Sequence, residues 1–326
     1  MSRGYKQEMA KKIIVTGGAG FIGSNLTEVL LNDERVSFVR VIDDLSNGYY
    51  ENVAGFEGNP KFEFVRADIC DYESMVTLTK GFDAISHQAA LGSVPRSIRN
   101  PMLTNSVNID GTVNILHAAV TNGIERVVLA CSSSTYGDSP ELPKKEERIG
   151  KPLSPYAITK FAMELYADVF FKTYGLNYVG LRYFNVFGPR QSPDNPYAAV
   201  IPLFCKAFLE GVSPVINGDG ETSRDFTYVD NAVQANMLAL FTGDARALNQ
   251  VYNVACGEQT TLNSLVGMLR EVSGRDIKAE HGPERPGDVR HSRADITKIK
   301  TLLGYEPAVY FRDGLAKIYS WYSERK

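Results

Sequence analysis

The chain has 326 residues, of which 44% are hydrophobic, and this is enough for two domains that share a large core. Its 35 basic and 38 acidic residues give a net charge of −3, which excludes the basic surface needed by a partner such as nucleic acid or an anionic membrane. No apolar run approaches a bilayer span, no signal-peptide core opens the sequence and the four cysteines lack metal-ligand spacing, so we expect a cytoplasmic protein with free thiols and no metal.

Short runs rich in Val and Ile alternate with longer amphipathic stretches through the first part of the chain, as is typical of a parallel sheet covered by helices on both faces. We predict strands at Lys12–Val15, Phe38–Asp43, Phe62–Ala67, Ala84–Gln88, Arg126–Ser132 and Tyr178–Phe184. We predict helices at Phe21–Leu31, Ser74–Lys80, Met102–Asn122 and Pro155–Tyr174. The expected fold class is α/β, a Rossmann-like doubly wound parallel sheet.

The pattern changes after about Asn185, where five prolines fall within 26 residues and strand and helix patterns become mixed. We therefore predict a first domain over residues 1–185 and a smaller mixed α/β domain over residues 186–326. The segments Phe226–Val229 and Val251–Val254 again have strand composition, so we expect residues 225–257 to return to the first domain. The chain is expected to end in a small helical cap.

A glycine-rich loop follows the first predicted strand and opens the first predicted helix. Glycines let the backbone turn tightly and approach a pyrophosphate, whose charge is stabilised by the free amides at the helix N-terminus. The spacing is GxxGxxG rather than GxGxxG, which is typical of the short-chain dehydrogenase type of nucleotide loop. The residues expected to contact the cofactor here are Gly17, Gly20, Phe21, Ile22 and Gly23.

Two carboxylates follow the next strands. Asp43 ends the second predicted strand, 20 residues after Gly23, where a carboxylate accepts hydrogen bonds from the adenosine ribose of NAD and repels the 2′-phosphate of NADP. Asp68 follows the third strand and is expected to accept a hydrogen bond from the adenine amino group, although a helix-capping role fits its position nearly as well. The predicted cofactor is therefore NAD.

Tyr156 and Lys160 lie four residues apart at the start of a predicted helix and so share one face. A phenol is a poor base at neutral pH, but a neighbouring ammonium and the positive nicotinamide ring favour its phenolate, which can take a proton from a substrate hydroxyl. Lys160 can also reach the nicotinamide ribose. Hydroxyl side chains end the fifth predicted strand, and either Ser132 or Ser133 is expected to bridge the substrate hydroxyl and Tyr156.

Taken in this order, the motifs resemble the extended short-chain dehydrogenase/reductases that act on nucleotide sugars, most closely the UDP-N-acetylglucosamine 4-epimerases of bacterial polysaccharide synthesis. The resemblance covers almost the whole chain. The matching segments are Thr16–Ser24, Asp43, His87–Ser97, Ser132–Gly137, Tyr156 with Lys160, Arg182–Gln191, Gly218–Gly220, Ser223–Phe226 and Arg285–Asp288. It implies NAD as the cofactor, a UDP-sugar as the substrate and a homodimer formed through two long helices per subunit, here Met102–Asn122 and Pro155–Tyr174.

The resemblance also implies contacts on the substrate side of the site. Asn185 would hold the diphosphate region, Arg224 a phosphate oxygen, and Arg285 with Asp288 the phosphate and the uridine ribose. The other substrate contacts that it implies are Ser93, Arg96 and Ser292.

The reaction can be narrowed further within the family. Its dehydratases carry an Asp–Glu pair after the catalytic threonine and its decarboxylases a glutamate, whereas this chain has Ser133 and Ser134 there. Hydroxyl groups cannot replace carboxylates in an elimination, so chemistry at a single carbon is expected. Tyr156 would remove the O4 proton while hydride leaves C4 for NAD, and the resulting 4-keto sugar would turn and accept the hydride on its other face. The predicted reaction is C4 epimerisation of a UDP-N-acetylhexosamine, UDP-GlcNAc to UDP-GalNAc.

Two alternatives remain open: 4-epimerisation of UDP-Glc/UDP-Gal or of UDP-uronates such as UDP-GlcNAcA, and, from a different class, a noncatalytic NAD-binding sensor. Ser292 bears on the first, because it matches the position of a bulky tyrosine in 4-epimerases limited to glucose and galactose. A serine there leaves room for a 2-acetamido group, while a place in a surface turn is the competing interpretation. The intact Tyr156, Lys160 and serine run argue against a sensor.

Overall fold

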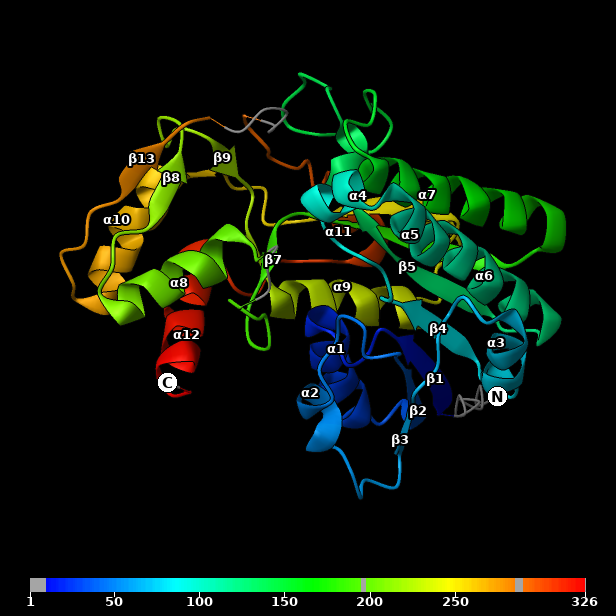
Figure 1. Cartoon of the computed structure of the whole chain (residues 1–326). Helices are drawn as coiled ribbons and strands as arrows, with labels where there is room; N and C mark the ends of the chain where they lie inside the picture. The colour runs from blue at the N-terminus through cyan, green and yellow to red at the C-terminus, as the bar shows by residue number, and fades with distance from the viewer. Residues whose placement is uncertain (1–9, 195–197, 285–289, 326) are drawn as a thin grey trace, which may run out of the picture.

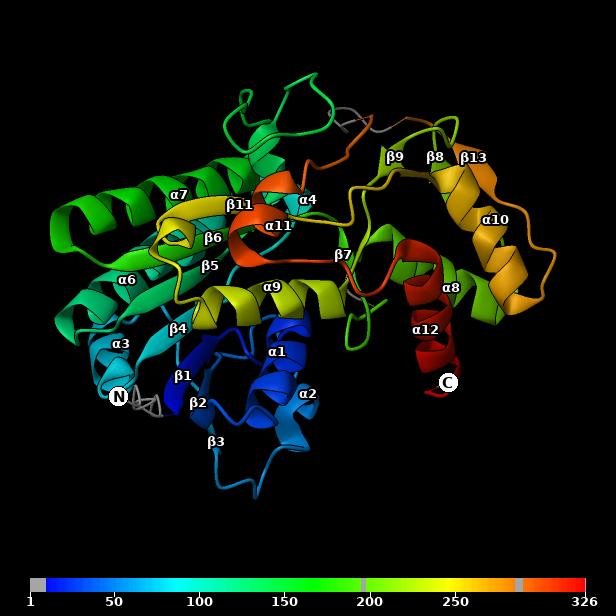
Figure 2. The ribbon, with the colours of Figure 1, turned by 180° about the vertical axis from the view of Figure 1, so that it is seen from behind.

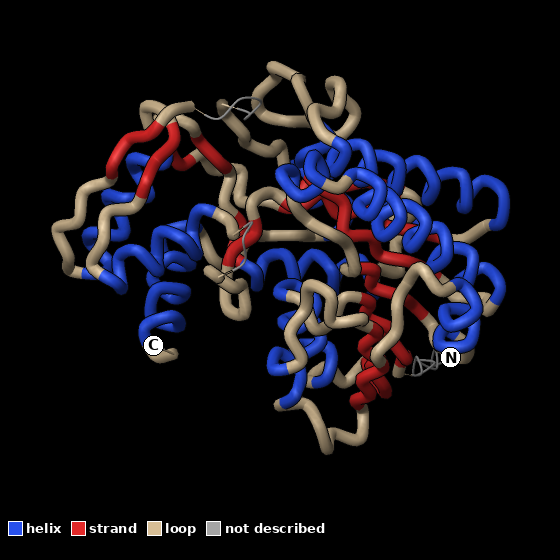
Figure 3. The backbone as a smooth tube through the Cα atoms, viewed as in Figure 1, coloured by secondary structure: helices blue, strands red, loops and turns tan. Residues whose placement is uncertain are grey.

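A seven-stranded parallel sheet forms the core of the larger lobe of the computed structural model (Figures 1 and 3). The structure describes residues 10–194, 198–284 and 290–325. The strands lie in the order β11-β6-β5-β4-β1-β2-β3, which is the doubly wound order extended by one strand. In chain order they are β1 (Lys11–Thr16), β2 (Val36–Ile42), β3 (Phe62–Val65), β4 (Ala84–His87), β5 (Arg126–Ser132), β6 (Asn177–Tyr183) and β11 (Gln250–Val254). The predicted α/β fold class is confirmed.

Helices cover both faces of this sheet (Figure 2). On one face lie α1 (Phe21–Leu31) and α9 (Val229–Phe241), and on the other α3 (Tyr72–Thr79), α6 (Gly111–Thr121) and α7 (Pro155–Tyr174). Strand β1 is buried on both faces, which explains its run of three apolar residues. Ile13 and Val15 point into the core beneath α1 and α9, while Ile14 points into the core beneath α6 and α7.

The strand register brings chemically important positions to one edge of the sheet. Thr16 at the end of β1 lies opposite His87 at the end of β4, and Ser132 at the end of β5 lies opposite Tyr183 at the end of β6. All of these strands are parallel, so the residues that follow them emerge together at their carboxyl ends.

The helix α7 has the bounds that its sequence predicts. The Ser154 hydroxyl accepts a hydrogen bond from the Ala157 amide at 3.1 Å, Pro155 occupies the first helical position and Gly175 ends the helix with a φ of 75°. Tyr156 is thereby fixed in the first turn of a well-capped helix.

The predicted helix Met102–Asn122 is one continuous helical segment with a local change of pitch. It comprises α5 (Pro101–Asn105), a π-helical turn η1 (Ser106–Asp110) and α6. Within the π turn the Asn108 side chain bonds to both the amide and the carbonyl of Leu91, at 2.8 and 3.3 Å, and to the Thr159 hydroxyl at 3.0 Å. The extra residue in the turn therefore aims a buried amide at the loop after β4.

A smaller lobe follows, and Figure 1 shows it beside the sheet domain. Its helices are α8 (Val200–Glu210), α10 (Leu262–Ser273) and α12 (Phe311–Ser323), with α11 (Thr297–Leu303) against β11. Its short strand pairs are β7 (Val186–Phe187) with β10 (Thr227–Tyr228), β8 (Val215–Asn217) with β13 (Glu280–Gly282), and β9 (Ser223–Arg224) with β12 (Thr260–Thr261). The remaining short helices are α2 (Glu51–Ala54), α4 (Val94–Arg99), η2 (Ser133–Tyr136) and η3 (Ala245–Ala247).

The two late strand predictions have different outcomes. Val251–Val254 lies in β11, which pairs with β6 at the edge of the large sheet. Phe226–Val229 is not a strand of that sheet: only Thr227 and Tyr228 form a ladder, with β7, and Val229 already begins α9. The long buried face of α9 on the sheet overrides the local preference of this segment for a strand.

Candidate active site

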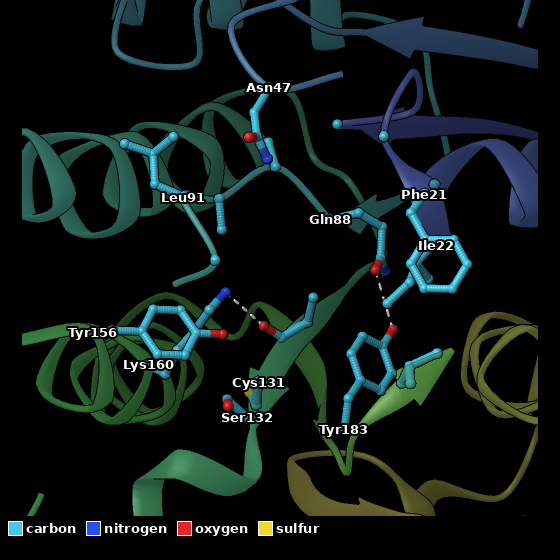
Figure 4. Close-up of a pocket in the computed structure, with 18 of the residues that line it drawn as sticks. Phe21, Ile22, Asn47, Gln88, Leu91, Cys131, Ser132, Tyr156, Lys160 and Tyr183 are labelled. Atoms are coloured by element: carbon cyan, nitrogen blue, oxygen red, sulfur yellow. Dashed lines mark hydrogen bonds between the residues drawn. The ribbon is translucent and has the colours of Figure 1, made fainter. Parts of the chain in front are cut away.

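A cavity of about 600 Å³ opens at the carboxyl ends of the parallel strands. Gly17 follows β1, Gln88 follows β4, Ser132 ends β5 and Tyr183 ends β6, and all four line it. Figure 4 shows Gln88, Ser132 and Tyr183 around the cavity. This is the edge at which ligands bind in doubly wound sheets. The cavity brings together these residues predicted from the sequence: Gly17, Gly20, Phe21, Ile22, Gly23, Asp43, Asp68, Ser132, Ser133, Tyr156, Lys160, Asn185, Arg224 and Ser292.

The glycine loop leaves no space for side chains. Gly17 has a φ of +67°, and a Cβ on it would lie 2.6 Å from the Ala89 amide nitrogen; a Cβ on Gly23 would lie 2.2 Å from the Gly17 carbonyl oxygen. Gly20 caps α1 without a side-chain hydrogen bond, so the first amides of the helix remain available at the cavity. The loop therefore fits a pyrophosphate held by backbone amides at a helix N-terminus.

Asp43 lies at the other side of this loop. The carboxylate accepts hydrogen bonds from the amides of Ala19, at 3.0 Å, and Leu45, at 2.9 Å. Burial raises the pKa of Asp43, and these backbone hydrogen bonds oppose the shift. Each oxygen keeps a second lone pair, so the group can still accept hydrogen bonds from a ribose.

Asp68 is exposed and lines the same cavity, and it accepts a hydrogen bond from the Cys70 amide at 2.8 Å. The capping role that its position allowed belongs to another residue, because Asp71 is the N-cap of α3 and accepts from the Ser74 amide at 3.2 Å. The Asp68 carboxylate therefore stabilises a turn and borders the cavity rather than capping a helix.

Tyr156, Lys160 and Ser132 meet at the base of the cavity. The Lys160 ammonium donates to the Ala130 carbonyl at 2.8 Å and lies 6.0 Å from the centre of the Tyr156 ring (Figure 4). Burial lowers the pKa of Lys160 to about 8. Burial raises the pKa of the Tyr156 phenol, and a hydrogen bond with the Ser132 side chain opposes that shift. The side chain that lowers the pKa of the phenol in the protein alone is thus Ser132.

This geometry distinguishes the two serines that the sequence left equivalent. Ser132 is buried and interacts with Tyr156, and its hydroxyl accepts hydrogen bonds from the amide and the hydroxyl of Ser134, at 3.1 and 2.9 Å. Ser133 begins the 3-10 turn η2 and lines the cavity. The structure therefore places Ser132 next to the phenol and Ser133 further along the cavity wall.

Only some of the residues predicted to bind the substrate can be placed at the cavity. Asn185 lines the cavity with a φ of 36°, a conformation that asparagine tolerates better than most residues, and Arg224 and Ser292 lie on the same wall. Arg285 and Asp288 lie outside the described residues.

Ser93 and Arg96 lie in the loop and helix beside the cavity. Ser93 is the N-cap of α4, and Arg96 donates to the Asn47 side chain at 2.9 Å. Neither is among the described residues that line the cavity, although Asn47 is. Ser93 therefore caps a helix, and Arg96 contacts a residue of the cavity wall, Asn47, without lining the cavity itself.

A polar network beside the cavity escaped the sequence analysis. The Tyr183 hydroxyl donates a hydrogen bond to Gln88 at 3.2 Å (Figure 4). It also accepts one from Asn236 at 2.7 Å, and Gln88 donates to Asn236 at 3.0 Å. Burial raises the pKa of Tyr183 to about 12. The partners come from β6, α9 and the loop after β4, so no local pattern in the sequence indicates that they meet.

The described residues show neither a metal cluster nor a membrane span. They contain no group of three or more His, Cys, Asp or Glu side chains that could hold a metal ion. None of their helices is long and apolar enough to cross a membrane. The four cysteines are free thiols.

Comparison with known proteins agrees with this geometry. Residues 13–255 match the model of the NAD dependent epimerase/dehydratase family. A UDP-glucose 4-epimerase of Mycolicibacterium smegmatis is 38% identical over 96% of this chain and 99% of its own length. Among solved structures, a UDP-N-acetylglucosamine 4-epimerase of Methanobrevibacter ruminantium M1 in complex with UDP-N-acetylmuramic acid is 40% identical, with a TM-score of 0.92 over 98% of this chain and 100% of that chain.

A third relative bears on the cofactor. The UDP-glucose 4-epimerase of Thermus thermophilus, solved as a complex with NAD, is 35% identical, with a TM-score of 0.86 over 96% of this chain and 99% of that chain. The glycine loop and the buried Asp43 fit the same dinucleotide. The chain therefore belongs to the NAD dependent epimerase/dehydratase family, and it is an enzyme whose cofactor is NAD.

Proposed function

We propose that the enzyme interconverts UDP-GlcNAc and UDP-GalNAc by epimerisation at C4. The observation that carries the proposal is the group of Tyr156, Ser132 and Lys160 in a cavity whose sugar side has hydroxyl groups after β5. Among the described lining residues, the carboxylates are Asp43, Asp44 and Asp68, and all three follow β2 or β3, on the cofactor side. Elimination or decarboxylation would require a further acid–base group next to the sugar, in addition to Tyr156, and this wall offers serines instead.

The chemical roles follow from these positions. NAD, when bound, supplies the acceptor and donor of the hydride. The Tyr156 oxygen takes the proton of the substrate O4 and later returns it, and the Ser132 hydroxyl shares a hydrogen bond with that oxygen. Lys160, held by the Ala130 carbonyl, keeps a positive charge near the phenol at pH values below about 8. The phenol loses its proton more easily when this charge is present.

The N-acetylated substrate is supported by the cavity wall at Ser292. This residue is half-buried, lines the cavity and is fixed by a hydrogen bond from its amide to the Ser223 carbonyl at 3.1 Å. A side chain of this size leaves room for a 2-acetamido group. The relative of known structure from Methanobrevibacter ruminantium, named a UDP-N-acetylglucosamine 4-epimerase, supports the same choice.

Separate incubations with UDP-GlcNAc, UDP-Glc and UDP-GlcNAcA test the proposal, with the products resolved by chromatography and NMR. We expect the highest kcat/KM with UDP-GlcNAc and formation of UDP-GalNAc. A higher value with UDP-Glc or UDP-GlcNAcA would assign the enzyme to one of the alternative epimerases. NAD binding without turnover of any of the three sugars would favour the sensor.

Asp43 is proposed to set the preference for NAD. Replacing it with alanine, Asp43→Ala, removes a charged acceptor for the ribose hydroxyls and also leaves the Ala19 and Leu45 amides without their partner. We expect NAD retention to weaken by about 1.5–3 kcal/mol and discrimination against NADP to narrow. The nucleotide released from denatured protein, quantified by chromatography, measures both effects.

Asp83→Ala is a matched control for this substitution. Its carboxylate accepts the Lys12 amide at 2.7 Å, so the same backbone bond is lost at the amino ends of the strands, away from the cavity. NAD content should be unchanged in this variant. Wild-type protein that carries NADP, or a loss of NAD equal in the two variants, would contradict the role of Asp43.

We also propose that the enzyme is a homodimer. On α7, Leu165 and Val169 are 53% and 52% exposed, while Met163, Ala167 and Phe170 of the same helix are buried against the sheet. The helix α5 lies beside α7 (Figure 1). Its Met102 and Leu103 side chains are exposed. These apolar side chains on two adjacent helices form the kind of surface that a second subunit covers.

Light scattering should therefore give twice the chain mass of 36.0 kDa for the wild type. Leu165→Glu places a charge in the proposed contact and should reduce the mass to that of one chain at micromolar concentration. Val212→Glu alters an equally exposed apolar residue of the smaller lobe and should leave the dimer intact. A monomeric wild type would exclude this assembly.

The two parts of the chain contribute to different sides of the cavity. We propose that residues 1–185, together with 225–257, hold NAD, and that residues 186–326 supply the UDP-sugar contacts.

The four free thiols favour a reducing compartment, so we expect the enzyme in the cytoplasm.

A further inference from the structure

Asp225 is a fully buried carboxylate that the proposed reaction does not use. Its Oδ1 accepts a hydrogen bond from the Cys256 amide, and its Oδ2 accepts from the amides of Gly257 and Ala294, each at 3.1 Å. Among the described residues it takes part in no ion pair, so backbone amides stabilise the buried charge. Cys256 and Gly257 follow β11 of the large sheet, whereas Ala294 belongs to a segment of the C-terminal part of the chain.

That segment, residues 290–295, contributes Ser292 to the wall of the cavity, and we call it the roof segment. It contains Ser292, and it pairs with the loop before α7: the Lys144 amide donates to the Arg293 carbonyl at 2.7 Å, and the Asp295 amide donates to the Lys144 carbonyl at 2.9 Å. Figure 1 shows this part of the chain crossing above the sheet toward α11. The roof segment therefore spans from the smaller lobe to the NAD-binding side.

Asp225 joins the three described cavity-lining residues that are expected on the substrate side. It directly follows Arg224 in the chain, its carbonyl accepts a hydrogen bond from the Asn185 side chain at 3.2 Å, and its carboxylate holds Ala294, two residues after Ser292. Arg224, Asn185 and Ser292 line the cavity, whereas Asp225 itself does not. One buried residue thus links three parts of the cavity wall that are distant in the sequence.

We infer that Asp225 is a positioning residue for the sugar nucleotide, because its ionised carboxylate holds the roof segment in register with Arg224 and Asn185. An ionised carboxylate can accept all three amide hydrogen bonds, whereas an asparagine has one acceptor oxygen. Whichever oxygen is replaced, Asp225→Asn turns an NH₂ group toward at least one of these amides, so it disturbs the link between the end of β11 and the roof segment without changing the volume of the side chain. The inference rests on the proposed function in one respect, namely that the ligand is a UDP-sugar.

The test measures steady-state kinetics and amide hydrogen exchange on NAD-loaded Asp225→Asn. We expect KM for UDP-GlcNAc to rise about tenfold or more, kcat to change less than about threefold, NAD content to stay constant and exchange in residues 290–295 to become faster. The matched control is Asp83→Asn. It makes the same isosteric change at a carboxylate that accepts the Lys12 amide at 2.7 Å, away from the cavity, so it should leave both KM and exchange in residues 290–295 unchanged.

The wild type supplies a second measurement that requires no substitution at Asp225. Burial raises the pKa of Asp225 to about 7. The carboxylate that holds the roof segment is therefore present above this pH and is protonated as the pH falls through it, so KM should rise on acidification. The neighbouring Cys256 thiol and Tyr305 phenol both have raised pKa values, about 12 for the thiol, and stay neutral throughout.

One histidine of the roof segment needs a control of its own. The His291 ring shares a hydrogen bond with the Ser223 hydroxyl at 2.8 Å, so a second side chain that can bind a proton lies in the roof segment itself. The rise in KM on acidification should therefore persist in His291→Gln and disappear in Asp225→Asn. If it disappears in His291→Gln instead, the histidine and not the carboxylate is the titrating group, and the pH argument is wrong.

The outcomes separate this inference from the proposed function. A fall in kcat with an unchanged KM, or unchanged exchange in residues 290–295, would overturn the positioning role. If the wild type turns over a different UDP-sugar, the same split between KM and kcat is measured on that sugar. If it turns over none, hydrogen exchange and the affinity for UDP still decide whether Asp225 orders the roof segment.

Discussion

Tyr156→Phe is expected to lower kcat by roughly 10²-fold to 10⁴-fold while bound NAD is retained. The substitution removes only the phenolic oxygen, which lies in the cavity and interacts with Ser132. Without it, no described side chain at the base of the cavity is positioned to take the O4 proton, because Lys160 donates to the Ala130 carbonyl. Turnover of UDP-GlcNAc, followed by chromatography of the UDP-sugars, gives kcat, and the released nucleotide reports NAD content.

Tyr166→Phe is the control for this experiment. It removes the same atom from the same helix, at a side chain that is 41% exposed and does not line the cavity. Its kcat should equal that of the wild type. Near wild-type turnover by folded, NAD-loaded Tyr156→Phe would show that another group is the base.

Ser292→Tyr is expected to reduce kcat/KM for UDP-GlcNAc by about 100-fold or more, while UDP-Glc retains most of its rate. Ser292 lines the cavity, and the Ser223 carbonyl and the bridge between Lys144 and Ala294 fix its backbone, so the roof segment cannot move away easily from a larger side chain. A tyrosine ring would then fill the space proposed for the 2-acetamido group. Closely packed sites do not absorb such an addition without a cost to binding.

Ser292→Ala separates size from hydrogen bonding. It removes the hydroxyl but leaves the space, so it should preserve the preference for UDP-GlcNAc. Parallel steady-state measurements on both sugars decide the matter. An equal fall on UDP-GlcNAc and UDP-Glc in Ser292→Tyr, or no fall on UDP-GlcNAc, would show that Ser292 does not select for size.

The elements of the first domain could be predicted closely because their signals are local. The helices α1 and α7 have the predicted bounds, and in α7 the cap Ser154, Pro155 and the terminal Gly175 all act within one or two turns. For the smaller lobe, the sequence predicts only a mixture of helices and strands. Its strands are two or three residues long and are stabilised by partners far along the chain, as in the pairing of β9 with β12, so local patterns could not define them.

The same distinction holds for the site: its local features could be predicted from the sequence, and its long-range contacts could not. Glycines that must approach each other within one loop, and Tyr156 with Lys160 on one helical face, are visible from spacing alone. The contact between Ser132 and Tyr156 depends on how the end of β5 meets α7, which spacing cannot show. The same is true of Ser93, whose sequence motif suggested a substrate contact and whose hydroxyl caps α4 in the structure.

The amino-acid sequence by itself determined the parallel α/β architecture, the dinucleotide loop and the tyrosine–lysine pair. Each of these depends on residues within about one element, where hydrophobic period, glycine placement and helical spacing act directly. Only the tertiary structure decided which serine meets the phenol, how Tyr183 joins Asn236, 53 residues away, and how Asp225 ties the roof segment to the large sheet. These contacts join distant parts of the chain, and buried polar groups acquire their partners only when packing removes them from water.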